Sequence, residues 1–200
     1  MCQLVETIKC FNGKIFNLKY HQIRFNYTRK KIFNLTDELL LSEAIIIPPE
    51  NEKGLFRCRV VYSSKIELIE FVPHQYRPIK SLRLVESTDI NYNFKYTCRE
   101  NLDQLFARRG SYDDIIIVKD DLITDSYTAN LIFFDGKKWW TPDTPLLLGT
   151  QRERLLSEGK IFPRKITIGD LTLYQKAGLI NAMQSLENMP IVDINQIQKF

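Results

Sequence analysis

The chain has 200 residues, of which 44% are hydrophobic and 26% charged, and its net charge at pH 7 is +4. This length suffices for one large domain or two small ones with a substantial core. The charge is mild and the Lys and Arg residues are scattered, which argues against a basic nucleic-acid-binding module. No apolar run approaches the length of a transmembrane helix, so no membrane association is predicted.

The chain has four cysteines, Cys2, Cys10, Cys58 and Cys98, without metal-ligand spacing. No signal peptide precedes them, so we expect reduced thiols in a cytoplasmic protein. With only two histidines, the sequence predicts no metal site.

The first third of the chain predicts a small α+β domain. Asn12-Gly13 is a hairpin signature between two apolar runs. The predicted elements are strands 4–10 and 14–17, helices 19–34 and 36–44, and strands 55–62 and 65–72. Thr36 is the predicted N-cap of the second helix.

Within helix 19–34, His21, Arg24 and Phe25 lie on a stripe that we expect to be buried. A buried guanidinium has to be paired with an anion. By spacing alone, however, an arginine in an amphipathic helix is usually solvated or paired locally. We interpret His21 as a structural residue.

A strand at 82–86 is followed by Lys95, which lies between Phe94 and Tyr96. A lysine between aromatic residues is usually a surface residue whose stem packs on a ring. Residues 102–109 have helical spacing, and Gly110 ends that helix.

Residues 113–159 begin with a buried strand at 115–118 and continue with a hairpin of strands 129–134 and 137–141. Between them lies an isolated acid, Asp125, which requires a partner. Gly149-Thr150 then opens a helix, where free backbone amides suit an anion. Thr150 and Glu153 also have the spacing of a capping box, which would use some of the same donors. The last part predicts a strand at 161–168 and a short helix from Asp170.

Several segments carry a resemblance to a known family, among them "LVETIKC", "HQIR", "LITDSYTANLIF", "FDGKKWWTP" and "LLLGTQRERLL". Their order and spacing resemble the class IV aminotransferases. These pyridoxal-phosphate enzymes include branched-chain and D-amino-acid aminotransferases and aminodeoxychorismate lyase. One residue departs from the family pattern, since Asp125 stands where the family has a glutamate.

The resemblance implies the α+β architecture of fold type IV, with two small α/β domains at 1–88 and 89–200 and the active site in the cleft between them. It implies that Lys95 forms the Schiff base with the cofactor and then acts as the base. It also implies that Asp125 keeps the pyridine nitrogen protonated. Because aspartate is one methylene shorter than glutamate, either the strand lies closer to the ring or a water bridges the gap.

The resemblance further implies that Arg24 forks onto the cofactor phosphate and that Thr150 and Gln151, at the start of their helix, bind it too. Asn181 lies in "GLINAMQSL", which is similar to a strand of the lyases beside the cofactor. Contact with the cofactor or substrate and capping of a strand end are both open for Asn181. Arg99 and Tyr96 are positional candidates for binding a substrate carboxylate.

The implied activity is that of an aminotransferase or an aminodeoxychorismate-type lyase, acting on an amino acid or an aminodeoxychorismate-like substrate. The chain is short at both ends, which is more similar to the lyases. The family is homodimeric, so a homodimer is expected. The alternative is a non-catalytic relative that keeps the fold and binds the cofactor or a protein partner, which the change to Asp125 and the short N-terminus motivate.

Overall fold

The computed structural model describes residues 3–199, and the chain divides into two units. Unit 1 comprises the residues up to Tyr76 together with Phe94–Cys98, and unit 2 comprises Arg77–Asn93 and the residues from Arg99 onward. The division lies earlier than the predicted boundary at residue 88. It does so because the strand at 82–86 pairs with a strand of unit 2. Lys95, expected in the second domain, belongs to unit 1.

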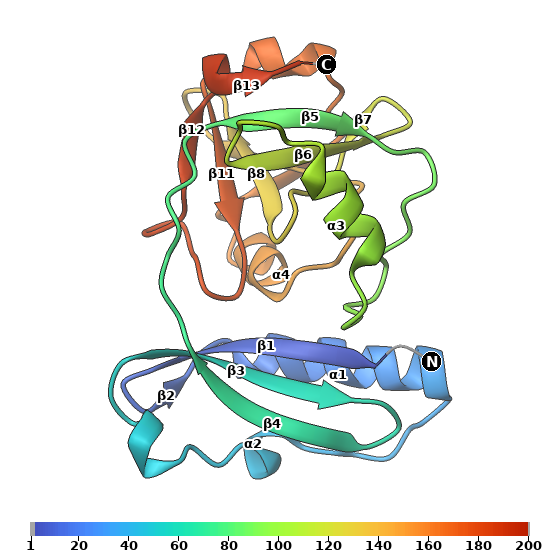
Figure 1. Cartoon of the computed structure of the whole chain (residues 1–200), viewed down its shortest axis with the longest axis vertical. Coiled ribbons are helices and arrows are strands. Elements are labelled where there is room, and N and C mark those ends of the chain that lie inside the picture. The colour runs from blue at the N-terminus through green and yellow to red at the C-terminus, as the bar shows by residue number, and fades with distance from the viewer. Residues whose placement is uncertain (1–2, 200) are drawn as a thin grey trace. The chain divides into compact units, whose positions relative to one another are not determined.

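Unit 1 is a four-stranded antiparallel sheet with a long helix (Figure 1). Its elements are β1 (Leu4–Phe11), β2 (Lys14–Ile15), α1 (Leu18–Phe33), α2 (Leu41–Ala44), the 3-10 turn η1 (Pro49–Asn51), β3 (Leu55–Tyr62) and β4 (Ile66–Pro73). The strand order is β2-β1-β3-β4. Asn12 and Gly13 both have positive φ, as the predicted hairpin requires.

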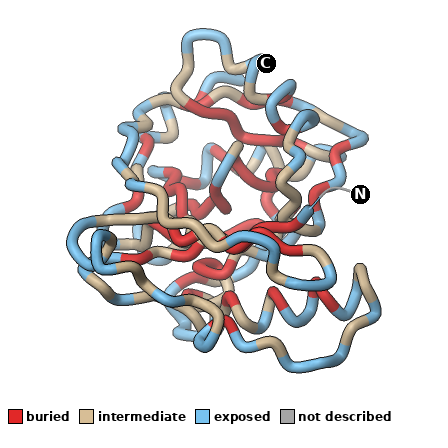
Figure 2. The backbone as a smooth tube through the Cα atoms, turned by 60° about the horizontal axis from the view of Figure 1, so that its bottom comes forward, coloured by how far each residue is buried: buried red, intermediate tan, exposed pale blue. Residues whose placement is uncertain are grey.

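The core of unit 1 lies between one face of this sheet and α1. Leu4, Glu6 and Ile8 alternate along β1 and are fully buried, whereas Phe25 is the fully buried aromatic residue of α1. Figure 2 shows buried residues recurring along strands and helix in this way. The period of two in the strand therefore places an acid, Glu6, among apolar residues.

The predicted helix at 36–44 is wrong except for its last turn, α2. Side chains of α1 hold the preceding residues in a non-helical conformation. The guanidinium of Arg29 donates to the carbonyl and the carboxylate of Asp37, and Gln22 accepts from the backbone N–H of Leu41. These tertiary contacts replace the cap that Thr36 was expected to provide.

Within the described residues, unit 2 contains two sheets, two α-helices and two 3-10 turns (Figure 1). The elements are β5 (Leu82–Glu86), α3 (Glu100–Ala107), β6 (Asp114–Lys119), β7 (Leu122–Ile123), β8 (Asn130–Phe134), β9 (Trp139–Pro142), α4 (Thr150–Ser157), β10 (Phe162–Arg164), η2 (Gly169–Leu173), β11 (Lys176–Ile180), β12 (Ile191–Asp193), η3 (Ile194–Gln196) and β13 (Ile197–Gln198). The sheet orders are β10-β9-β8-β11-β12 and β13-β5-β6-β7.

The two sheets of unit 2 share one apolar core. Leu84 and Ile116 of the smaller sheet belong to the same buried cluster as Leu131 and Leu179 of the larger sheet. A second cluster lies on the other face of the larger sheet, where Ile132 packs with residues of α4. The buried strand and the hairpin predicted between residues 115 and 141 are confirmed.

The predicted strand at 161–168 is only partly correct, because the regular strand ends at Arg164 and only an isolated bridge joins Thr167 to Leu122. Thr167 and Asp170 then bind each other: the Asp170 carboxylate accepts from the Thr167 backbone N–H at 2.9 Å and from its hydroxyl at 2.8 Å. Such a local side-chain bond favours a turn over a strand. The short helix expected from Asp170 is the 3-10 turn η2.

The cysteine prediction is confirmed for two residues and wrong for a third. Cys10 and Cys58 are free and buried, whereas Cys98 is disulfide-bonded. Cys2 lies outside the described residues.

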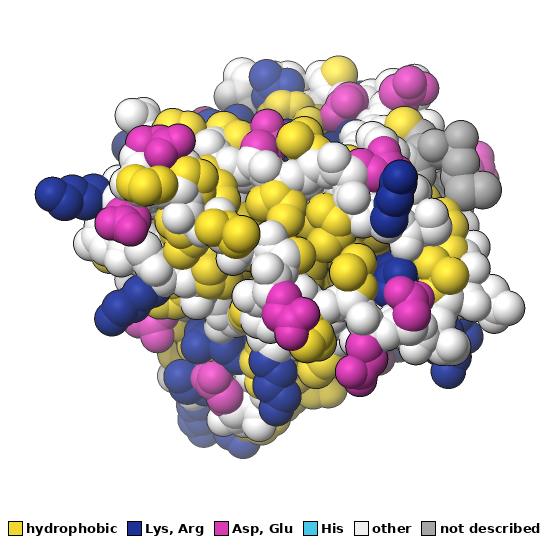
Figure 3. All heavy atoms as spheres, turned by 90° about the horizontal axis from the view of Figure 1, so that it is seen from below, with side chains coloured by type: hydrophobic (Ala, Val, Ile, Leu, Met, Phe, Trp, Pro, Cys, Tyr) yellow, Lys and Arg dark blue, Asp and Glu magenta, His cyan; other side chains and the backbone are white. Residues whose placement is uncertain are grey.

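The surface of the described chain is characterised by the length of its helices and by its apolar side chains. No helix within residues 3–199 has the length and apolar character needed to cross a membrane. Figure 3 shows a face on which hydrophobic side chains gather among charged ones. The most exposed large apolar residue is Ile46, in the segment after α2, at 78%.

Candidate functional site

A buried carboxylate in unit 1 holds two of the residues that the sequence singled out. Glu6 on β1 accepts from His21 Nδ1 at 2.6 Å, and its two oxygens accept from Arg24 Nε at 2.9 Å and Arg24 Nη2 at 2.6 Å. His21 and Arg24 are three residues apart on α1, so they share the helix face that packs on the strand. The Glu6 side chain is 0% exposed and that of Arg24 is 13% exposed.

The charges of this cluster follow from its hydrogen bonds. Burial alone would raise the pKa of Glu6, but the Arg24 charge and the bonds from His21 and Arg24 lower it to about 2. Burial lowers the pKa of His21, despite the bond to Glu6. Since an ionised carboxylate can only accept, the neutral imidazole carries its hydrogen on Nδ1. His21 is thus a structural residue, as interpreted from the sequence, and its contact is with Glu6, the residue that binds Arg24.

Lys95 lies beside this cluster. Its backbone carbonyl accepts from the N–H of Val5 at 2.9 Å, so the segment runs along β1. Burial and, to a smaller extent, the charges of Arg24 and Lys95 lower the pKa of His21. Tyr96 forms a β-bridge with Leu4. Lys95, Arg24 and Glu6 thus belong to one neighbourhood of unit 1.

Asp125 is a buried acid of unit 2, at 6% exposure. Its Oδ1 accepts from Asn130 Nδ2 at 2.7 Å, and its Oδ2 accepts from the backbone N–H of Leu147 at 2.9 Å. Burial raises the pKa of Asp125 to about 6, although these bonds and the charge of Arg152 oppose the rise. The acid that lacked a visible partner in the sequence therefore has two, one of them 22 residues away along the chain.

The same asparagine reaches the turn that opens α4. Asn130 Nδ2 also donates to the Leu147 carbonyl at 2.9 Å. A Cβ at Gly149 would lie 1.9 Å from Asn130 Oδ1, so the close approach requires a glycine there. Asp125 and the start of α4 are thus joined through Asn130 and Leu147.

The predicted capping box at the start of α4 does not form. The N-cap is Gly149, which has no side chain, and its carbonyl accepts from the Glu153 N–H. The Glu153 carboxylate pairs instead with Arg152 at 3.0 Å. Thr150 and Gln151 are 3% and 2% exposed in the first turn. Their position at the positive end of the helix dipole suits an anion.

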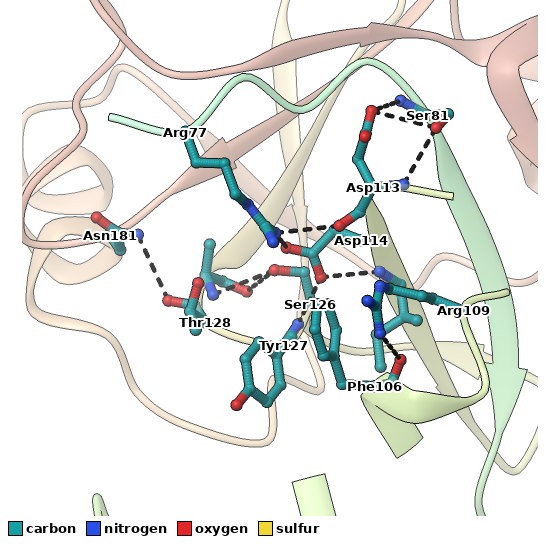
Figure 4. A network of polar contacts seen from close by, with 12 residues as sticks. Arg77, Ser81, Phe106, Arg109, Asp113, Asp114, Ser126, Tyr127, Thr128 and Asn181 are labelled. Atoms are coloured by element: carbon teal, nitrogen blue, oxygen red, sulfur yellow. Dashed lines mark hydrogen bonds and ion pairs between the residues drawn. The ribbon is translucent and has the colours of Figure 1, made fainter. Parts of the chain in front are cut away.

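Asn181 follows β11 and caps the turn after it. Its Oδ1 accepts from the backbone N–H groups of Met183 at 2.9 Å and Gln184 at 3.1 Å. Its Nδ2 lies 3.5 Å from the Thr128 carbonyl, as the dashed line in Figure 4 shows. Asn181 therefore caps this turn and also contacts the loop after Asp125, whereas its contact with the cofactor or substrate stays a prediction.

A second buried acid, Asp114, supports that loop (Figure 4). Its Oδ1 accepts from the backbone N–H of Tyr127 at 3.3 Å, and Arg77 Nη2 lies 3.3 Å from its Oδ2. Burial raises the pKa of Asp114. Arg99, a candidate for binding a carboxylate, donates to the Tyr127 carbonyl at 2.6 Å and lies over the Tyr127 ring.

Sequence reasoning missed Glu6, Asn130 and Asp114. A signal existed for Glu6, because the alternation in "LVETIKC" places it on the buried face with Leu4 and Ile8. A signal existed for Asn130 as well, since it belongs to a quoted family segment. Lys95 lies in unit 1 and Asp125 in unit 2, so their pairing across the cofactor ring stays a prediction.

Comparison with known proteins finds the same family over nearly the whole chain. The family model described as amino-transferase class IV matches residues 3–194. An uncharacterized protein of Haemophilus influenzae is 41% identical over 194 residues, which is 93% of this chain and 100% of that protein.

Several solved structures are also similar to this chain, including one from Haemophilus somnus and one from Mycobacterium tuberculosis. A crystal structure from Haemophilus somnus 129PT, provisionally named a 4-amino-4-deoxychorismate lyase, is 33% identical with a TM-score of 0.87. It covers 93% of this chain and 98% of its own. A hypothetical aminotransferase from Mycobacterium tuberculosis, in a PLP-bound form, is 15% identical with a TM-score of 0.77. The match covers 100% of this chain and 84% of that one, and at this identity it shows the fold alone.

Proposed function

The chain belongs to the class IV aminotransferase family, and from this premise we propose that it is a pyridoxal-phosphate-dependent enzyme acting on a small substrate with an amino group. The observation that carries the proposal is Asp125, a buried carboxylate with a hydrogen bond to each oxygen. Such an acid is suited to a cationic ring nitrogen, because an adjacent positive charge lowers its pKa from about 6 and keeps it ionised.

The donor set of the chain fits this cofactor. Lys95 supplies a primary amine for the aldehyde, and the first turn of α4 supplies backbone amides for the phosphate. Arg24 supplies a guanidinium beside Lys95, whose fixed donors suit a phosphate. When bound, the cofactor provides an electron-withdrawing ring that takes up the charge left by a departing α-proton.

Each residue then has a defined task. Lys95 Nζ would hold the cofactor through its aldehyde and, once released by the substrate, would accept the α-proton of the substrate. Asp125 holds a proton on the ring nitrogen. Arg24, Thr150 and Gln151 anchor the phosphate so that the ring keeps its position when Lys95 is released. Asn181 fixes the loop after Asp125.

Of the two reaction outcomes, we favour the lyase. The relative at 33% identity carries a provisional lyase name, and it matches nearly the full length of both chains. The two activities differ in their products, since a lyase would release a leaving group from the substrate and an aminotransferase would release a keto acid. We also propose a homodimer in the cytoplasm, as in the family.

A panel assay on the purified, cofactor-loaded protein tests the proposal. One arm follows pyruvate release from aminodeoxychorismate, and the other follows keto-acid formation from amino acids with an acceptor keto acid. We expect turnover in the first arm. Turnover only in the second identifies an aminotransferase. A protein that binds the cofactor but turns over nothing in either arm is the non-catalytic relative, and Lys95→Ala serves as the inactive control.

A further inference from the structure

We propose that Glu6 is a positioning residue that fixes the guanidinium of Arg24 for binding the cofactor phosphate. The inference rests on the proposed function only for the identity of the anion. It concerns contacts within unit 1, and it can be tested without turnover.

Glu6 determines the orientation of Arg24 through two parallel hydrogen bonds. Nε donates to one carboxylate oxygen at 2.9 Å and Nη2 donates to the other at 2.6 Å. This bidentate pairing fixes the plane of the guanidinium as well as its position. His21 Nδ1, at 2.6 Å from the same carboxylate, holds Glu6 itself in place.

The pairing also decides which edge of Arg24 meets an anion. A guanidinium has five N–H donors in a fixed fork. The Nε–Nη2 edge faces Glu6, so a phosphate has to approach through the Nη1–Nη2 edge. The fork onto the phosphate would therefore use the edge adjacent to the one that Glu6 occupies, and the two edges share Nη2.

Stability alone does not account for a glutamate at this position. Glu6 lies on a strand face between Leu4 and Ile8, which are 0% exposed, and its cross-strand neighbour is the equally buried Val60. Replacing buried ion pairs by apolar residues of similar volume is often neutral or stabilising. An apolar residue at position 6 with an apolar partner at position 24 would thus fold as well. Orientation of Arg24 explains why a glutamate occupies this buried position.

A rigid arginine binds an anion at a smaller entropic cost than a mobile one. An unrestrained side chain loses rotamer freedom on binding. Glu6 removes that freedom before the cofactor arrives, since both groups are held within the folded unit. The hydrogen bonds from Arg24 to Glu6 also prevent the guanidinium from turning toward other acceptors.

A double-mutant cycle on the apoprotein tests the inference. The variants are Glu6→Gln, Arg24→Lys and the double variant, and the measurement is the dissociation constant for pyridoxal phosphate and for inorganic phosphate. We expect Glu6→Gln to weaken both by roughly tenfold, in the range of coupling between contacting residues. If Glu6 acts through Arg24, Glu6→Gln has no further effect in the Arg24→Lys background. Losses that multiply in the double variant overturn the inference, as does unchanged binding by either single variant.

A matched control and a spectroscopic measurement separate positioning from stability. Glu70→Gln removes the partner of Arg59 elsewhere in the same sheet, and we expect it to leave phosphate binding unchanged. In protein with ¹⁵N-labelled arginine, the Nε–H signal of Arg24 should be distinct in the wild type and averaged in Glu6→Gln. An unchanged signal contradicts the inference.

Glu6→Asp covers the case in which Glu6→Gln fails to fold. It keeps the charge but retracts the carboxylate by one methylene, so it should give an intermediate loss of phosphate binding and complete the same cycle with Arg24→Lys. If phosphate binding follows these expectations while the panel assay shows no turnover, the proposed activity fails and the role of Glu6 stands.

Discussion

Asn130 donates its amide to Asp125 across 2.7 Å, and the same side chain leaves no room for a Cβ at Gly149. One asparagine therefore connects the acid assigned to the cofactor ring with the helix start assigned to its phosphate. The two assignments came from separate segments of the sequence. Because Asn130 connects Asp125 with the start of α4 within unit 2, substitutions at these positions have distinct expected effects.

Replacing Asp125 by asparagine should stabilise the apoprotein at pH 8 but not at pH 4. The pKa of Asp125 rises from 3.8 to about 6 on folding, so the folded protein binds a proton that the unfolded chain releases between these values. Stability from this group is present below pH 3.8 and is lost as pH rises through 6, by at most about 3 kcal/mol. Urea unfolding of Asp125→Asn at both pH values measures this, with the exposed Asp143→Asn as the control. Equal effects at pH 4 and pH 8 contradict it.

The same Asp125→Asn variant should retain the cofactor and lose most of its rate. An amide cannot keep the ring nitrogen protonated, so proton abstraction slows, whereas Lys95 and the phosphate contacts remain. Cofactor absorbance and steady-state turnover, measured on one preparation, check both parts. Wild-type turnover would remove Asp125 from its assigned role.

Gly149→Ala should destabilise unit 2 by about 1–3 kcal/mol, as overpacking of a buried site does. The added Cβ would meet Asn130 Oδ1, whereas the backbone of Gly149, at φ −73°, is allowed for any residue. Thermal unfolding measures the loss. Asn130→Ser should recover part of it in the double variant, because serine is too short to reach the Cβ. Gly169→Ala, where the nearest atom is 3.7 Å away, is the control.

Lys95→Ala should abolish both the yellow colour of the loaded protein and its turnover. No other amine is assigned to the cofactor aldehyde, and an alanine provides neither attachment nor a base. The absorption spectrum after dialysis against pyridoxal phosphate checks the first effect. Lys14→Ala, at the exposed first residue of β2, should behave as wild type. A yellow Lys95→Ala protein means that another lysine carries the cofactor.

Glu6→Gln should cost stability at pH 7 and almost none near pH 2. The pKa of Glu6 falls from 4.5 to about 2 on folding, so its contribution is present above pH 4.5 and is lost as pH falls through 2. The shift corresponds to about 3 kcal/mol. Guanidinium unfolding at pH 7 and at pH 2 compares the variant with wild type and with Glu70→Gln. A constant difference at both pH values contradicts the predicted charge of Glu6.

The sequence by itself determined the elements whose signals are local. The hairpin at Asn12-Gly13 and the helix carrying His21 and Arg24 were predicted, because turn residues and periodic patterns act over a few residues. The role of Asp125 came from the resemblance to the family. Tertiary structure decided which groups meet. The helix expected from Thr36 is mostly replaced by contacts with Arg29 and Gln22, which lie on another helix.

The tertiary structure also determines the partners of the buried charges. Glu6 binds Arg24 across 18 residues of chain, and Asp125 binds the Leu147 N–H across 22. A buried charge requires a partner, and the sequence pattern can predict which charged residues are buried. Which donor satisfies it depends on how strands and helices pack, because the distances that decide hydrogen bonding exist only in the folded chain.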